Sequence, residues 1–205
     1  MDKRRISVLF SLFLILPFSA HCEIFTFRAD KMSGGKAAGK EVTILTGNAE
    51  VRSDKLLLKA ERIEIYGKNN QLIQCSGNVW GNEEEKQIFF RTDSMNYDRK
   101  TKIARLEGAS SLEDRKNEVV ARGRFIEYDD RAEVTVLQIQ VRIFKDEMVC
   151  RSEYAVYRRS QKLLDLSGFP VVYKKNDEFR ADRIRVDLDT DDVTMQGSVS
   201  GAIKE

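Results

Sequence analysis

Residues 60–65 read Ala-Glu-Arg-Ile-Glu-Ile, and their pattern of small-x-x-apolar-x-apolar returns four more times along this chain of 205 residues. The five copies begin at Ala60, Thr92, Gly123, Ser152 and Ala181, with spacings of 32, 31, 29 and 29 residues. A repeat of this length matches one supersecondary unit, and such units bury their apolar faces by stacking on their neighbours. The repeat therefore predicts a stacked architecture.

A second marker falls 16 or 17 residues after each start. It is glycine in four copies and Ile139 in the third, and Gly47 precedes the first copy in the same role. The four glycines are Gly77, Gly108, Gly168 and Gly197. A glycine inside a strand pattern indicates a bulge or a close approach of two backbones.

Between its two markers, each copy carries a short polar stretch rich in Asp, Asn, Gly, Ser and Arg. These stretches are residues 67–70, 98–101, 129–131, 158–161 and 189–192. Such residues favour tight turns, and the flanking Val, Ile, Tyr and Thr favour strands. Each copy is thus predicted to be two antiparallel strands of about 8–12 residues joined by a turn. The predicted class is all-β, an elongated and open stack of two-strand units.

The apolar positions of each copy are two residues apart, so they face the same side of a strand. Together they predict one apolar wall that runs through the stack. Its members are Ile63, Ile65, Met95, Tyr97, Ile126, Tyr128, Tyr157, Ile184 and Val186. The fourth copy has Ala155 where a larger apolar residue is usual. Because no Gly-, Ser- or Pro-rich linker divides the copies, residues 23–205 are predicted to form a single domain.

The first 22 residues have the features of an export signal. Lys3, Arg4 and Arg5 precede an apolar run from Ile6 to Phe18, which at 13 residues is shorter than the ~20 that a membrane-spanning helix needs. Cleavage after Cys22 would leave Glu23 as the first residue. The alternative is a lipoprotein in which Cys22 is acylated, although His21 is a poor match to the small residue that usually precedes it.

The remaining composition argues against several function classes. Of 35 basic and 33 acidic residues, Lys3, Arg4, Arg5 and Asp2 lie in the expected signal, which leaves 32 of each sign and no net charge that favours nucleic acid. The only histidine is His21, so the exported chain would lack a His-based nucleophilic system or zinc site. Abundant carboxylates give no specific support for glycoside hydrolysis. We therefore expect no enzyme and no cofactor.

Three smaller features leave alternatives open. Cys75 and Cys150 are either a disulfide or two buried thiols. The run at residues 187–192 resembles part of a calcium loop but lacks its central glycine and terminal glutamate, so we expect an acidic turn and no metal. Four arginines are candidates to bind phosphate groups, or are solvated strand and turn residues. They are Arg122, Arg124, Arg158 and Arg159.

Several segments of the repeat resemble the OstA-like family of periplasmic lipopolysaccharide transport proteins, which includes LptA. They are Ala29-Asp30, residues 45–51 (Leu-Thr-Gly-Asn-Ala-Glu-Val), residues 60–63 (Ala-Glu-Arg-Ile), residues 76–79 (Ser-Gly-Asn-Val) and residues 181–184 (Ala-Asp-Arg-Ile). The third copy departs from the pattern at Ile139. The related component LptC keeps an N-terminal membrane helix, and the short run here favours the LptA-like form.

The resemblance implies an open, twisted β-jellyroll that carries lipopolysaccharide or a related acylated glycolipid across the periplasm. The apolar wall named above would then line the lipid-binding groove. Related jellyroll proteins of the inner- and outer-membrane machinery, or further copies of this chain, would join end to end. Edge-strand contacts for them are expected at Phe25, Phe27, Val199 and Ile203. The alternative is a structural or adaptor protein of the envelope whose apolar wall fills a closed core.

Overall fold

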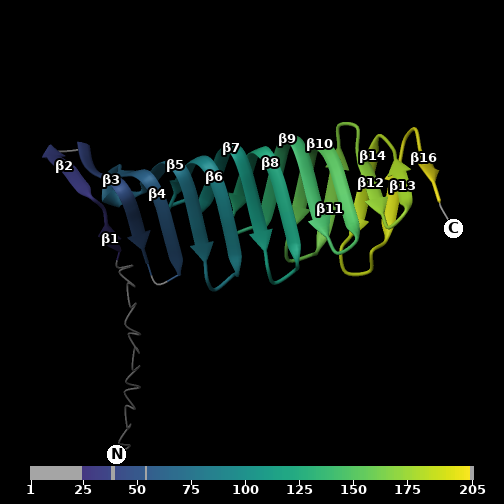
Figure 1. Cartoon of the computed structure of the whole chain (residues 1–205), viewed down its shortest axis with the longest axis horizontal. Helices are drawn as coiled ribbons and strands as arrows, with labels where there is room; N and C mark the ends of the chain where they lie inside the picture. Colours follow the sequence, from purple (N-terminus) through teal and green to yellow (C-terminus); the bar gives the residue numbers. More distant parts are fainter. Residues whose placement is uncertain (1–24, 38–39, 54, 204–205) are drawn as a thin grey trace, which may run out of the picture.

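The computed structural model describes residues 25–37, 40–53 and 55–203, which form one antiparallel sheet of 16 strands (Figure 1). The long strands are β3 (Lys40–Arg52), β4 (Leu56–Tyr66), β5 (Leu72–Glu83), β6 (Ile88–Asp98), β7 (Ile103–Asp114), β8 (Val119–Asp129), β9 (Val134–Lys145) and β10 (Met148–Arg158). The short strands are β1 (Thr26–Arg28), β2 (Lys31–Ala37), β11 (Leu163–Ser167), β12 (Val171–Lys174), β13 (Asp177–Arg180), β14 (Arg183–Asp187), β15 (Val193–Gln196) and β16 (Ser200–Ala202). The expected signal, residues 1–22, lies outside the described residues. Within the described ranges, no helix has the length and apolar character to cross a membrane.

Consecutive strands pair with each other and stack along the long axis of the molecule (Figure 1). The sheet does not close on itself, because β1 and β2 lie at one end and β15 and β16 at the other. The predicted fold class, an elongated and open all-β jellyroll of antiparallel two-strand units, is confirmed.

Each long strand is broken by a bulge near its middle. The ladder register shifts between Ser76 and Val79 where β5 meets β6. An equivalent shift occurs in each of the remaining pairings of consecutive strands from β3 to β10. A bulge bends its strand and re-aims the side chains that follow. The line of bulges is therefore a crease along which the sheet folds into two walls.

The predicted glycine markers lie on this crease. Gly47, Gly77, Gly108, Gly168 and Gly197 all have positive φ, between 72° and 96°. Each glycine faces a carboxylate side chain of a neighbouring strand: Asp30, Glu61, Asp93, Glu153 and Asp182, respectively. In the pair of Gly77 with Glu61, the next residue, Asn78, donates a hydrogen bond of 2.8 Å to Glu61 Oε1. The acid of each copy and the glycine thus form one recurring contact.

The third copy replaces both partners of this contact. Arg124 stands at the acid position and Ile139 at the glycine position, and Ile139 adopts φ 65° with half of its surface exposed. A β-branched residue is strained in this region of φ. The neighbouring Gln140 amide donates instead to Glu153 Oε2 at 3.2 Å. The crease therefore continues through the third copy at a conformational cost.

The two walls face each other and enclose the core. Wall A contains β1, β12, β13, β16 and the halves of the long strands that pair with them, while wall B contains β2, β11, β14, β15 and the other halves. Inward side chains alternate with outward ones in both halves, and the phase of alternation changes at the bulge. One continuous cluster of buried apolar side chains runs between the walls.

Replacing Gly77 with Ala tests the crease. The added methyl group would lie 2.7 Å from Glu61 Oε2, at a φ of 77° that favours glycine, so we expect a loss of about 1–3 kcal/mol in unfolding free energy. Gly35→Ala is the matched control, since nothing lies within 4 Å of the position that its methyl group would take, and its φ is not positive. Urea denaturation of both variants gives the comparison, and equal stabilities would contradict the role of the crease.

Candidate functional site

The two walls meet again at a seam opposite the crease, where no ladder joins them among the described residues. The edge of wall A is formed by the turns at residues 83–88, 114–119 and 145–148, and the edge of wall B by those at 98–103, 129–134 and 158–163. Only side chains and single backbone groups connect these two edges. The seam is therefore the place where the interior can be opened at least cost.

A buried polar cluster holds the middle of the seam. This seam cluster consists of Lys86, Asp114 and Asn117 from wall A and Asp130, Glu133, Tyr157 and Arg159 from wall B.

Arg159 is the centre of the seam cluster and is only 6% exposed. Its Nε donates to Asp114 Oδ2 at 2.9 Å, and its two Nη atoms reach Glu133 Oε1 at 3.1 Å and the Lys86 carbonyl at 2.7 Å. Tyr157 also donates to Asp114 Oδ2, at 2.9 Å. Every side-chain hydrogen bond of Arg159 except the one to Glu133 crosses the seam.

The charges of the seam cluster are kept inside by mutual pairing. Asp114 has no exposed surface, and an unpaired carboxylate there would carry a large desolvation penalty. Burial alone would lower the pKa of Arg159, but its hydrogen bond and ion pair with Asp114 outweigh this and raise it. Burial, reinforced by the charge of Asp114, raises the pKa of the Tyr157 hydroxyl. Tyr157 thus stays protonated and able to donate.

An apolar cavity of about 110 Å³ lies between the walls next to the seam cluster. Its apolar lining is Phe25, Leu56, Leu58, Ile88, Phe90, Met95, Tyr97, Ala104, Leu106, Leu112 and Tyr128. Its polar lining is Ser53, Lys55, Glu83, Arg99, Lys102 and Asp130, which come from the edges of both walls. The cavity therefore has an apolar floor and a charged mouth in the seam.

Two features shape the mouth of this cavity. The Arg99 guanidinium lies 4.2 Å from the centre of the Phe25 ring and donates to the Asn70 carbonyl at 3.0 Å. Burial raises the pKa of the Glu83 carboxyl, against the opposing effect of a hydrogen bond from the Lys86 amide. Basic and acidic groups thus share the mouth above an apolar interior.

The structure places the predicted wall residues together on wall B. Seven of them are at most 9% exposed: Ile63, Met95, Ile126, Tyr128, Tyr157, Ile184 and Val186. Ile65 and Tyr97 are partly buried and pack against the same core. Met95, Tyr97 and Tyr128 line the cavity, whereas Tyr157 belongs to the seam cluster.

Wall A was missed by the sequence reasoning. Its inward side chains include Leu58, Ile88, Leu112, Ala121, Ile143 and Cys150, all nearly inaccessible. Their alternation is visible in the sequence, but it is out of phase with that of wall B because the bulge adds one residue. The inward residues of wall A can be identified from the sequence when the alternation is continued past each glycine marker with its phase shifted by one residue.

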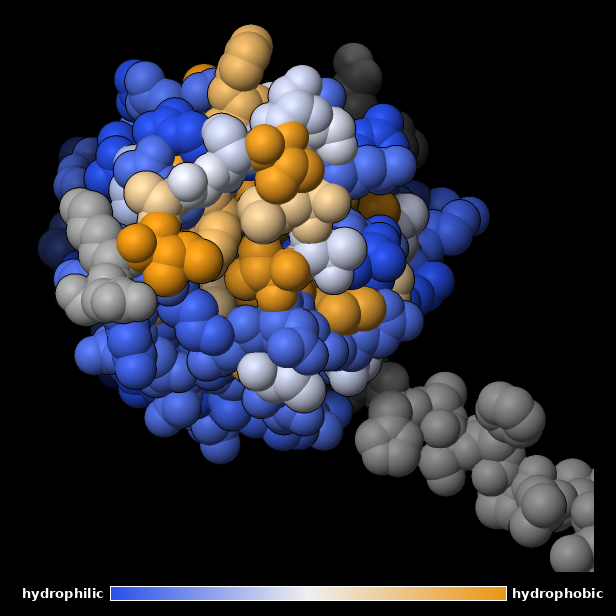
Figure 2. All heavy atoms as spheres, turned by 90° about the vertical axis from the view of Figure 1, so that its right-hand side faces the viewer, coloured by the Kyte–Doolittle hydropathy of each residue, from blue (hydrophilic) through white to orange (hydrophobic). Residues whose placement is uncertain are grey.

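The predicted edge residues lie at the two ends of the sheet. Phe27 is in β1 and half exposed, and Phe25 directly precedes that strand. Val199 and Ile203 flank β16 and are 56% and 77% exposed. Figure 2, which views the C-terminal end, shows hydrophobic side chains gathered in the middle of this end within a hydrophilic ring. The open end thus exposes apolar surface.

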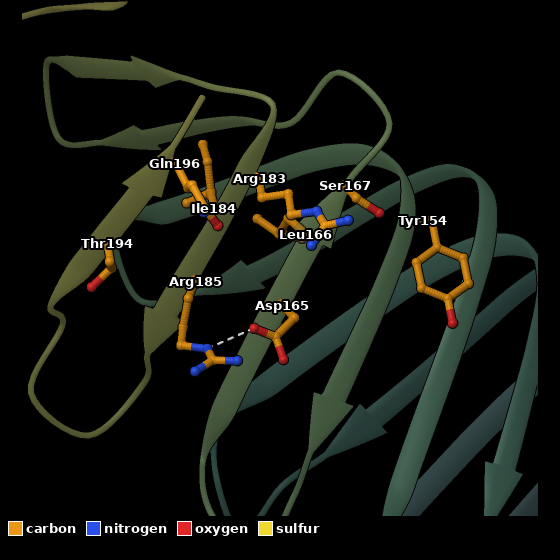
Figure 3. Close-up of a pocket in the computed structure, with 9 residues that line it drawn as sticks. All are labelled: Tyr154, Asp165, Leu166, Ser167, Arg183, Ile184, Arg185, Thr194 and Gln196. Carbon is orange, nitrogen blue, oxygen red and sulfur yellow. Dashed lines mark hydrogen bonds and ion pairs between the residues drawn. The ribbon is translucent and has the colours of Figure 1, made fainter. Parts of the chain in front are cut away.

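A larger pocket lies on the outer face of wall B (Figure 3). It has a volume of about 470 Å³ and is lined by Tyr154, Asp165, Leu166, Ser167, Arg183, Ile184, Arg185, Thr194 and Gln196. Arg185 Nε donates to Asp165 Oδ1 at 2.7 Å across its floor. It lies outside the interior and is lined by other residues than the cavity at the seam.

The alternatives left open by the sequence resolve differently. Cys75 and Cys150 are free thiols, and burial raises the pKa of each to about 12. Asp187 accepts hydrogen bonds from the amides of Asp189 and Thr190 and so shapes a turn. Of the four candidate arginines, Arg159 is buried in the seam cluster, Arg158 pairs with Asp165, and Arg122 and Arg124 are exposed on the outer face.

Comparison with known proteins gives a family match. A model described as OstA-like protein matches residues 21–189. Among solved structures, the chain is similar to LptH from Pseudomonas aeruginosa, described as the LptA homologous periplasmic component of the conserved lipopolysaccharide transport device. The two share 11% identity over 89% of this chain and 96% of that chain, with a TM-score of 0.28. No curated protein sequence matches this chain.

Removing the Arg159 side chain tests the seam cluster. Arg159→Met leaves Asp114 buried without its charge partner, so we expect a loss of about 3–5 kcal/mol in unfolding free energy by urea denaturation. Adding Asp114→Leu to the same chain should recover most of the loss, because no buried charge then remains. Arg158→Met is the control, and its exposed ion pair should contribute less than about 1 kcal/mol. Equal effects of the two single substitutions would refute a buried cluster.

Proposed function

Because this chain belongs to the OstA-like family, we propose that it is a periplasmic lipid carrier that shields the acyl chains of lipopolysaccharide or a related glycolipid between its two walls. It makes and breaks no covalent bond. The observation that carries the proposal is the apolar cavity whose mouth at the seam is lined by Lys55, Arg99 and Lys102. Export with removal of residues 1–22, which leaves residues 23–205 as one β-domain, is part of the proposal.

Lipid uptake requires the seam to widen beside the seam cluster. The cavity of about 110 Å³ is well below the ~300–1,000 Å³ of pockets that enclose a small ligand. Each methylene that leaves water contributes about 0.8 kcal/mol, so a dozen of them offset the several kcal/mol needed to separate packed side chains. Acyl chains would thus enter where half-buried side chains such as Leu56 and Phe90 line the seam.

A filled core without cargo is the second candidate, and it defines a structural or adaptor protein of the envelope. It is favoured by the tight packing of the interior, since Ile63, Ile126 and Ile184 are at most 1% exposed. The two candidates differ in whether the protein carries lipid when it is isolated from its envelope.

Leu56→Asp tests the carrier function. Leu56 is half-buried in the cavity lining, so a carboxylate there should exclude acyl chains and lower bound lipid at least ~10-fold while the fold persists. Bound lipid is measured by native mass spectrometry of protein purified from its envelope, followed by organic extraction. Leu72→Asp is the matched control, because Leu72 is equally half-buried but points to the outer face of β5. If the wild-type protein is isolated without lipid and takes up no added lipid, the carrier function is refuted and the adaptor function is favoured.

End-to-end association is the second part of the proposal. β1 and β2 at one end, and β15 and β16 at the other, each have one side unpaired within the described sheet. Such edges accept further strands from another chain. The partners would be related jellyroll proteins of the membrane machinery or other copies of this chain, with contacts through Phe25, Phe27, Val199 and Ile203.

Charged substitutions at the C-terminal end test this association. Val199→Lys with Ile203→Lys should weaken self-association at least ~10-fold in sedimentation velocity, since it removes exposed apolar contacts and adds repulsion. Both side chains are exposed, so stability should not change. Phe169→Lys is the control, because Phe169 is 91% exposed on the crease and away from the edges. If the wild-type chain stays monomeric at all concentrations, self-association is refuted and only related jellyroll proteins remain as partners of the ends.

A further inference from the structure

A row of arginines crosses the outer face of wall A. Ladder pairing places Arg122 directly opposite Arg142, and Arg142 directly opposite Arg151. Arg91 lies in the same row two strands away, with Ser111 between it and Arg122. All four arginines are exposed. Since adjacent strands are ~4.8 Å apart, the row of Arg91, Arg122, Arg142 and Arg151 extends over about 20 Å along the long axis.

The arginine row lacks carboxylate partners. Within the described residues, none of its four members forms an ion pair, and no acidic residue occupies the row between Trp80 and Val171. The nearest acids on the crease, Asp93 and Glu153, accept hydrogen bonds from the backbone amides of Ala109 and Gln140. Like charges directly opposite each other destabilise a sheet. The row therefore has a cost that folding alone does not explain.

Wall B provides an internal comparison, because three of its outer arginines have carboxylate partners. Arg105 Nε lies 2.7 Å from Glu127 Oε2, and Arg62 Nε lies 2.8 Å from Glu64 Oε1. Arg185 pairs in the same way with Asp165 at 2.7 Å. Arg115 and Arg180 of wall A pair in the same way with Glu113 and Glu178, so the four arginines of the row differ from these neighbours in having no acidic partner among the described residues.

An apolar and aromatic row runs beside the arginine row on wall A. Phe89, Val120, Phe144, Val149 and Tyr173 are half-buried there, in β6, β8, β9, β10 and β12. β7 places Glu113 between Phe89 and Val120, and Glu113 pairs with Arg115. The guanidinium of Arg122 lies 5.2 Å from the Phe144 ring centre, and that of Arg151 lies 5.2 Å from the Tyr173 ring centre. These rings support the guanidinium groups along the wall.

We propose that the outer face of wall A docks on the phosphate headgroups of an anionic phospholipid bilayer. Guanidinium groups bind phosphate with two parallel hydrogen bonds. To bind one small anion, the four guanidinium groups would have to converge on one point. They lie instead in a line on an open face, which suits a surface that carries many phosphates. Aromatic side chains beside basic ones are typical of the membrane interface. The docking face is separate from the lipid-binding interior and does not depend on it.

Flotation with lipid vesicles tests the docking face. The full exported chain is mixed with vesicles of phosphatidylcholine alone or of phosphatidylcholine with phosphatidylglycerol, at about 0.1 M and about 1 M salt. We expect binding to the anionic vesicles only, and loss of binding at high salt. Because each basic residue near such a surface strengthens partitioning about fivefold, Arg122→Gln, Arg142→Gln and Arg151→Gln together should weaken it ~100-fold.

A charge-matched triple variant is the control. Arg62→Gln, Arg105→Gln and Arg185→Gln remove the same number of positive charges from wall B, and this variant should keep most of the binding. The wall A variant should melt at or above the wild-type temperature, because it removes like charges that face each other. Both variants should yield the wild-type amount of extracted lipid, which separates this test from that of the carrier function. Equal losses in the two variants, equal binding to both vesicle types, or no binding to either would overturn the proposal. If the protein bound neither vesicle type, an acidic protein would be the better candidate for the partner of this face.

Discussion

A carboxylate that faces a left-handed glycine across two strands is the contact on which the rest of this structure depends. It recurs along the crease, as in the pair of Glu61 with Gly77, and it accompanies the bulge in every long strand except β8 and β9, where Arg124 and Ile139 take its place. The bulge lets one strand contribute to both walls. Without it, the sheet would be flat and one apolar face would have no cover, because the described residues contain only one short 3-10 helix, Lys68–Asn70, and no α-helix to provide it.

Folding along the crease creates the seam, and the seam creates the need for polar closure. The two wall edges are turns, which cannot extend a ladder across the gap, so side chains must connect them. Arg159 and Asp114 do this near the middle, where burial makes the pair costly to separate. The mouth of the adjacent cavity is lined by longer, less buried side chains such as Lys55 and Lys102. The interior is thus firmly closed at one place and easier to open beside it.

The two outer faces differ in a way that net charge does not reveal. Cross-strand neighbours decide whether an arginine is neutralised, and Arg105 opposes Glu127 on wall B whereas Arg142 opposes two further arginines on wall A. A chain with balanced totals can therefore present one strongly basic face. The outer face of wall A, the open ends of the sheet and the seam are three separate surfaces of the molecule.

The sequence by itself determined the strands, the turns, the repeat and the inward residues of wall B, because alternation and glycine spacing are local signals. It determined the ends of the stack for the same reason, through Phe27 and Val199. Tertiary structure decided the rest. The bulge geometry showed that wall A also faces the core. Folding brought Arg159 to Asp114, which is 45 residues away in the chain. The ladder register aligned the four arginines of the row on wall A. Contacts between distant segments depend on register and on how the sheet bends, which no local pattern encodes.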